Sequence, residues 1–251
     1  MTRWGQFTAL LIGQLSGRKS IRDIIDNLKA HRNKLYHSGV GNVSRSSLAR
    51  VNENQPAELY ESVFYKLLSK CRTVSPKHKF NFKNPLHSMD SSVIDLSLSV
   101  FPWADFRSTN GAIKRHSGFD HDGHLPAFMT ITEGKCHDIK GVPDIKLPKG
   151  SILAMDRGYN DYNWFESLNS RGVYFVTRLK KNSQYHVIES RDYDKRSAVT
   201  SDQEIKLTSQ KGKSSTGRLR RIGFKCSDTG KHYFFLTNNI EIVSQDYRRD
   251  L

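Results

Sequence analysis

Residues 151–159 (SILAMDRGY) combine a short apolar run with an acid and a turn. Such a run predicts a buried strand that ends at Asp156, and open α/β sheets place their ligand sites at the carboxyl ends of strands. A second strand-like segment, residues 87–95 (HSMDSSVID), puts Asp90 inside a run that we also expect to be buried. Because a buried carboxylate is costly without a cation, two acids on neighbouring strands favour a metal site. The alternative is that one acid caps a helix and the other forms a buried salt bridge.

Five blocks of sequence occur in chain order: MDSSVIDL at residues 89–96, FDHDGHLPAF at 119–128, GKCHD at 134–138, DRGY at 156–159 and FVTR at 175–178. Together they resemble the DDE transposases of bacterial insertion sequences, in particular the insertion-sequence-four family. The resemblance covers nearly the whole chain. It implies an α/β fold: a ribonuclease-H-like mixed sheet with helices, a β-strand insertion, and an N-terminal helical region.

The resemblance also implies the chemistry of the site. Asp90 and Asp156 would be catalytic metal ligands for two Mg²⁺ or Mn²⁺ ions roughly 3.5–4 Å apart in a phosphoryl transfer. Such hard cations prefer carboxylate oxygen and water. One ion would activate water to nick the element's end, and the freed 3′-hydroxyl would then attack target DNA. The implied auxiliary residues are Asp138, Arg157, Tyr159 and Arg178.

The third acid of the DDE set is missing from its expected context. In the family it belongs to a Y-x2-R-x3-E-x6-K pattern near the C-terminus, but here Tyr247 is followed at the arginine position by Asp250. Glu204 and Glu241 remain as substitutes without that context. We therefore expect a C-terminally truncated chain, inactive by itself, with the motif encoded downstream.

Charge points to a polyanionic partner. The chain has 40 Lys and Arg against 25 Asp and Glu, a formal charge of +15, and a pI of about 9.8. Nucleic acid is the partner that such a charge favours, although a merely basic protein would share it. The resemblance implies double-stranded DNA, both insertion-sequence ends and target, and a homodimer on paired ends.

Cysteine usage and hydropathy bear on the compartment. Three widely separated cysteines argue against a disulfide framework, so we expect a reducing, bacterial cytoplasmic setting at the nucleoid. The apolar patch at residues 9–12 is too short for a signal peptide, and we expect no membrane span.

Changes in composition and the positions of proline and glycine suggest five segments. We expect a helical DNA-binding region at 1–72, a linker at 73–86, a ribonuclease-H-like catalytic core at 87–181, a β-strand insertion at 182–239, and an incomplete return of the core at 240–251.

The first region should contain three main helices. An apolar stripe of Trp4, Phe7, Leu11 and Leu15 predicts the first, and Ser20 caps the second. The basic, hydroxyl-rich residues 43–50 could form a DNA-recognition helix bearing Arg45 and Arg50, or a plain connecting helix with solvated arginines.

The core and insertion should be rich in strands. We predict a hairpin of 112–119 and 125–132 around Asp122-Gly123, a helix at 161–170 and a strand at 173–177. Further strands are predicted at 184–188, 218–224 and 232–237, with a loop at 210–217. Further DNA contacts are assigned to Lys114, Lys180 and Lys181. His116, His121, His124, Cys136 and His137 crowd one region, but their spacing fits no standard zinc site.

These features predict DNA transposition by a DDE transposase. The alternative is a non-catalytic DNA-binding remnant that inhibits intact transposase. A generic ribonuclease-H-like nuclease, which would cleave without any end sequence, is a third interpretation.

Overall fold

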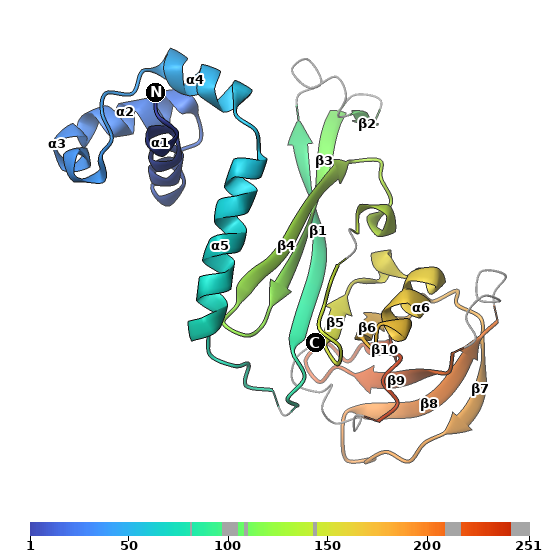
Figure 1. Ribbon diagram of the computed structural model, residues 1–251. Helices are drawn as coiled ribbons and strands as arrows, with labels where there is room; N and C mark the ends of the chain where they lie inside the picture. The colour runs from blue at the N-terminus through green and yellow to red at the C-terminus, as the bar shows by residue number, and fades with distance from the viewer. Residues whose placement is uncertain (81, 97–104, 108–109, 143–144, 209–216, 242–251) are drawn as a thin grey trace. The chain divides into compact units, whose positions relative to one another are not determined.

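The computed structural model describes residues 1–80, 82–96, 105–107, 110–142, 145–208 and 217–241 (Figure 1). The chain divides into two compact units, Met1–Leu67 and Leu68–Leu251, and each has its own core. Within these described ranges, no helix has both the length and the apolar character needed to cross a bilayer.

The first unit is built of helices. They are α1 (Arg3–Leu15), α2 (Ile21–Ala30), α3 (Arg32–Leu35), the 3₁₀ turn η1 (Tyr36–Ser38), α4 (Arg45–Asn54) and the first part of α5 (Glu58–Val74). Ser20 and Ser44 cap α2 and α4, because each hydroxyl accepts a hydrogen bond from the backbone N–H three residues later. The core of this unit consists of Ala9, Ile24, Ile25, Leu28 and Leu48.

The helix predicted from the spacing of Trp4, Phe7, Leu11 and Leu15 is present as α1, but these residues do not form its buried face. Trp4, Leu11 and Leu15 are 58%, 43% and 81% exposed. The buried face instead carries small and polar residues, among them Ala9 and Gly13. A Cβ atom on Gly13 would lie 2.7 Å from Ile24 Cδ1, so the absence of a side chain is what lets α2 approach this face.

In the second unit the described strands form one mixed sheet of ten strands. Its first part runs in the order β4 (Leu125–Glu133), β3 (Asn110–Asp120), β1 (Leu86–Leu96), β5 (Ile152–Met155) and β6 (Tyr174–Arg178), and the short β2 (Asp105–Arg107) also pairs with β3. β1, β3 and β4 are antiparallel, whereas β1, β5 and β6 are parallel. This confirms the mixed sheet of a ribonuclease-H-like fold.

The predicted hairpin turn between β3 and β4 is present. Gly123 has φ of 74° and His124 has φ of 54°, so two successive residues are left-handed. This backbone suits glycine and costs histidine some strain.

The segment after β6 extends the same sheet. It contributes β7 (Tyr185–Ser190), β8 (Val199–Leu207), β9 (Leu219–Lys225) and β10 (His232–Thr237), and β10 pairs antiparallel with β6. Three of these strands lie where they were predicted, but β8 was missed. Most of the expected 210–217 loop and residues 242–251 lie outside the described ranges.

One helix packs on the centre of the sheet. α6 (Tyr162–Ser170) begins at the N-cap Asp161 and is followed by Gly172 at φ 67°. Its Phe165 stacks on Phe175 of β6 with ring centroids 4.2 Å apart. Met89 and Met155, the residues that precede Asp90 and Asp156, belong to the same core cluster. The packed core therefore anchors the backbone just before both acids.

Candidate active site

The sheet brings Asp90 and Asp156 together. β1 and β5 are parallel neighbours with Met89 opposite Met155, so the next residue on each chain is an aspartate. Neighbouring strands lie about 4.8 Å apart. Both carboxylates therefore start from adjacent backbone positions, Asp156 just beyond the carboxyl end of β5 and Asp90 within β1, where the pairing of the two strands stops.

Neither acid is buried, which corrects the burial expected from the sequence. Asp90 is exposed, and the Asp156 side chain is 46% exposed. The physical reason is that β5 ends at Met155, so β1 has no parallel neighbour beyond Met89. The two acids are open to solvent and to ligands.

Asp156 is held in its charged form. Arg178 Nη2 lies 3.1 Å from Asp156 Oδ1. Met155 of β5 pairs with Thr177 of β6, so Asp156 and Arg178 are the next residues on the two neighbouring strands. Partial burial opposes ionisation, but hydrogen bonds from the Arg157 and Gly158 N–H groups and the Arg178 guanidinium outweigh it. Together they lower the pKa of Asp156 below its ordinary value.

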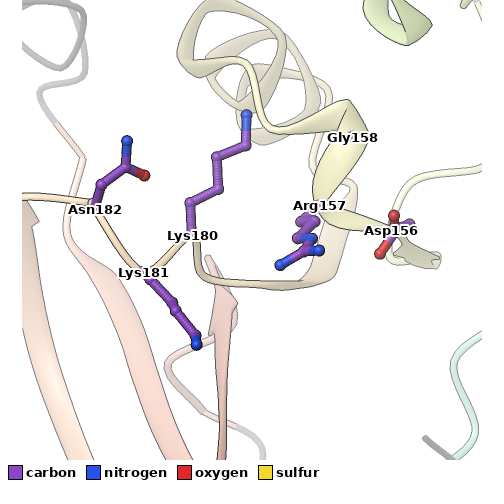
Figure 2. A pocket seen from close by; sticks show the side chains of 6 residues that line it. All are labelled: Asp156, Arg157, Gly158, Lys180, Lys181 and Asn182. Carbon is purple, nitrogen blue, oxygen red and sulfur yellow. The ribbon is translucent and has the colours of Figure 1, made fainter.

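A pocket of about 450 Å³ opens beside Asp156 (Figure 2). It is lined by Asp156, Arg157, Gly158, Lys180, Lys181 and Asn182. Figure 2 shows the two lysines on the segment that follows β6, with Arg157 between them and the Asp156 carboxylate. Three cations and one acid therefore line this pocket, a balance that suits a phosphate group.

A buried polar network lies behind the acids. His116 Nδ1 is 2.9 Å from the Tyr159 hydroxyl, and His116 Nε2 is 3.1 Å from Thr132 Oγ1. Ser91 Oγ donates to Asp138 Oδ1 over 3.2 Å. Lys114 Nζ lies 3.0 Å from the same oxygen. Burial, reinforced by the three nearby carboxylates, raises the pKa of Tyr159 to about 12.

The structure places the remaining predicted residues as follows. Asp138 lies on η3 (Asp138–Gly141) and Tyr159 on η4 (Arg157–Tyr159), where both join the network. Lys114, assigned to DNA from the sequence, has its ammonium group between Asp138 and the Cys136 carbonyl. Arg45 and Arg50 are exposed on α4.

His116, Ser91 and Thr132 were not singled out as site residues from the sequence. His116 was considered only as a zinc ligand. The structure brings two of them together, because β1 and β3 pair with Ser91 opposite His116 and both side chains share one face.

In the candidate site, the side chains suited to bind a metal ion are carboxylates and not histidines. In the described part of the chain no group of three or more His, Cys, Asp or Glu side chains could hold a metal ion. His116 is bonded through both ring nitrogens, and Glu204 pairs with Arg191 and Arg218. Asp90 and Asp156, which are neighbours in the sheet and exposed, fit hard divalent cations as a pair.

Comparison with known proteins adds the family. The family model "Transposase DDE domain" matches residues 94–242, a span that includes Asp156 and begins four residues after Asp90. Residues 1–41 match a domain of unknown function (DUF4372). A "Putative transposase y4zB" of Sinorhizobium fredii (strain NBRC 101917 / NGR234) is 25% identical over 196 residues, which is 76% of this chain and 54% of the relative. The chain thus spans about half the length of that curated relative. Since the Transposase DDE domain model matches more than half of the 251 residues, the chain belongs to the DDE transposase family.

Proposed function

We propose that this protein acts in DNA transposition, binding the ends of an insertion sequence and catalysing metal-dependent strand cleavage and transfer. The observation that carries the proposal is the register of β1 and β5, which sets Asp90 beside Asp156 where the parallel pairing of the two strands ends. Family membership supports the same reading. The insertion-sequence-four assignment belongs to this proposal too.

Asp90 and Asp156 are the residues that would hold Mg²⁺ or Mn²⁺. Asp156 keeps its negative charge because its pKa is lowered, and both side chains are open to solvent. The ions would supply Lewis-acid stabilisation of the attacking and leaving oxygens. Arg178 would orient the Asp156 carboxylate through their 3.1 Å ion pair.

The basic side chains around Asp156 would hold the DNA backbone. Arg157, Lys180 and Lys181 line the pocket next to the acid, so a phosphate seated there would lie beside the metal ligands (Figure 2). Neutralising phosphates in this way releases counterions and favours association. Asn182 could donate a hydrogen bond to the same strand.

The helical unit would read the element ends. α4 presents Arg45 and Arg50 to solvent while Leu48 anchors it in the core. A short helix with basic exposed residues is suited to lie in a DNA groove. We assign end recognition, and pairing of two copies on two ends, to the intact assembly.

The experiment that tests this proposal is a Mn²⁺ titration of the 251-residue chain, followed by electron paramagnetic resonance. Asp90→Asn and Asp156→Asn should each weaken Mn²⁺ binding at least tenfold, because each replaces one carboxylate ligand with a neutral amide. Asp95→Asn, an exposed acid on the same strand, is the matched control and should bind as the wild type does. Equal affinity in all four proteins would remove these acids from the site.

Cleavage separates the proposal from its rival. With Mn²⁺ and duplex DNA that bears the element's own ends, a transposase nicks at those ends, and Asp90→Asn abolishes nicking but keeps DNA binding. End binding without nicking in a chain extended to its relative's full length would instead identify a non-catalytic DNA-binding protein.

A further inference from the structure

We propose that Asp138, Ser91, Tyr159 and His116 form a positioning network that locks the β1 strand bearing Asp90 to the turn bearing Asp156. This inference rests on the proposed function, because it assigns these residues a role toward the two acids. Ser91 directly follows Asp90, and Tyr159 closes the 3₁₀ turn η4 that starts after Asp156. A hydrogen bond between the Tyr159 and Ser91 side chains connects the two segments.

The number of hydrogens on each polar group decides which partner donates in every hydrogen bond of this network. A carboxylate only accepts, so the one hydroxyl hydrogen of Ser91 is spent on Asp138 Oδ1. Tyr159 must then donate its own hydrogen to Ser91 Oγ. His116 Nδ1 must in turn donate to the Tyr159 oxygen over 2.9 Å, and His116 Nε2 must accept from Thr132 over 3.1 Å.

Two members of this hydrogen-bonded network are deeply buried, and the Asp138 carboxylate is held from two sides. Tyr159 is 1% exposed and His116 is fully buried. The Lys114 ammonium group lies 3.0 Å from Asp138 Oδ1 and balances the negative charge of this carboxylate, the last acceptor of the network. On the other side of Asp138, a Cβ atom on Gly158 would lie only 2.6 Å from Oδ2. The Asp138 carboxylate is thus fixed by a cation, a hydroxyl and the backbone of the Asp156 turn.

These contacts assign Asp138 a positioning role, distinct from metal binding. Its Oδ1 atom is engaged by Ser91 and Lys114, and the described carboxylates and histidines form no three-residue metal group. Asp138 instead accepts a hydrogen bond from Ser91, and Ser91 is hydrogen-bonded to Tyr159. These contacts fix the backbone next to Asp90 relative to the backbone next to Asp156, and so set the spacing of the two acids. Loss of one link should loosen the turn without unfolding the sheet.

Two measurements on the complete 251-residue chain test this inference without metal. The first is ¹⁵N NMR of the His116 ring, where we expect a proton on Nδ1 and none on Nε2. The second is amide hydrogen exchange at residues 157–159. Tyr159→Phe and Ser91→Ala should each speed exchange there about tenfold, as expected for loss of one buried hydrogen bond, and leave β9 and β10 unchanged.

Matched variants separate positioning from general destabilisation. Ser91→Thr keeps the hydroxyl and should restore wild-type exchange. Tyr162→Phe, whose ring packs on Phe165 outside the network, should also exchange as the wild type does. A proton on His116 Nε2, or equal exchange at 157–159 in Tyr159→Phe and Tyr162→Phe, would overturn the inference.

Mn²⁺ affinity then relates the network to the site. Tyr159→Phe and Asp138→Asn should weaken Mn²⁺ binding several-fold, less than the loss in Asp156→Asn. Complete loss of binding in Asp138→Asn would make it a ligand and contradict its positioning role. Absence of Mn²⁺ binding in the wild type would count against the proposed function alone, because the tautomer and exchange results decide the network independently.

Discussion

Two aspartate–arginine pairs on the same sheet have opposite settings. Asp156 and Arg178 lie 3.1 Å apart with side chains 46% and 49% exposed. Asp202 of β8 and Arg220 of β9 are 1% and 3% exposed and share two hydrogen bonds, the Nε–Oδ1 bond being 2.8 Å long. Arg220 also reaches the Ile240 carbonyl, at 3.4 Å.

The difference shows what each pair can do. The Asp202–Arg220 pair is buried, and its hydrogen bonds join β8 to β9 and hold the chain at Ile240. Neither charge is exposed to a ligand from solvent. The Asp156 carboxylate keeps one side open, next to Asp90 and to a cationic pocket. An acid that serves a ligand must keep such free coordination space, and it therefore contributes less to folding.

The largest expected effect is on the sealed pair. Asp202→Asn leaves the buried Arg220 guanidinium without its carboxylate, and we expect a loss of about 3–5 kcal/mol in the free energy of unfolding. Urea denaturation followed by circular dichroism measures it. A loss below about 1 kcal/mol would mean that the pair is not sealed in solution.

The pocket beside Asp156 should show its effect in DNA binding. Changing Lys180 and Lys181 together to Gln should flatten the slope of log K against log salt by about 2, one unit for each lost phosphate contact. Fluorescence anisotropy on duplex DNA between 50 and 200 mM salt, roughly the range over which such contacts weaken, measures this slope. Lys206→Gln with Lys231→Gln, exposed lysines on β8 and just before β10, should leave it unchanged. Equal slopes in both double variants would disprove the assignment.

A smaller effect is expected from His116. Burial lowers its pKa below the ordinary value of about 6.5. The unfolded chain therefore binds the proton more readily, and stability present above pH about 6.5 is lost as the pH falls through that value toward the folded pKa.

His116→Gln, which cannot titrate, should reduce this acid-induced loss. Urea midpoints at a neutral and a mildly acidic pH give the comparison. His87, also buried with a lowered pKa, remains in both proteins, so the difference reports His116. An unchanged pH dependence in the variant would show that His116 is not buried in its neutral form.

The smallest effect is expected at the open pair. Asp156→Asn and Arg178→Gln should each change the free energy of unfolding by less than about 1 kcal/mol, because exposed ion pairs contribute little. The same urea denaturation measures both. A loss comparable to that of Asp202→Asn would place Asp156 among the structural acids and remove the contrast between the two pairs.

Local patterns predicted much of the fold. The capping serine at Ser20, the turn at Gly123 and the strand that leads into Asp156 depend on residues close in sequence, and the structure has all three. β8 was missed because Asp202 and Glu204 make its sequence look solvated. They are buried because arginines from other segments, including Arg220, pair with them. Such partners are remote in sequence.

The candidate site was predicted in part for the same reason. Asp156 could be named from the end of its strand, Asp90 from its place inside a strand-like run, and both from family resemblance, and the sheet sets them side by side. Their exposure was not predictable, because it follows from the short length of β5. The link from Ser91 through Tyr159 to His116 joins three distant segments, which no periodicity in the sequence reveals.

The central claim is that one metal site lies between Asp90 and Asp156. Fe²⁺ in place of Mg²⁺, with ascorbate and peroxide, generates hydroxyl radicals at the bound ion, and mass spectrometry locates the backbone cuts. We expect cuts near residue 90 and near residue 156 together, both suppressed by excess Mn²⁺ and both absent in Asp156→Asn. Cuts at only one of these segments, or at neither while iron is bound, would contradict the account.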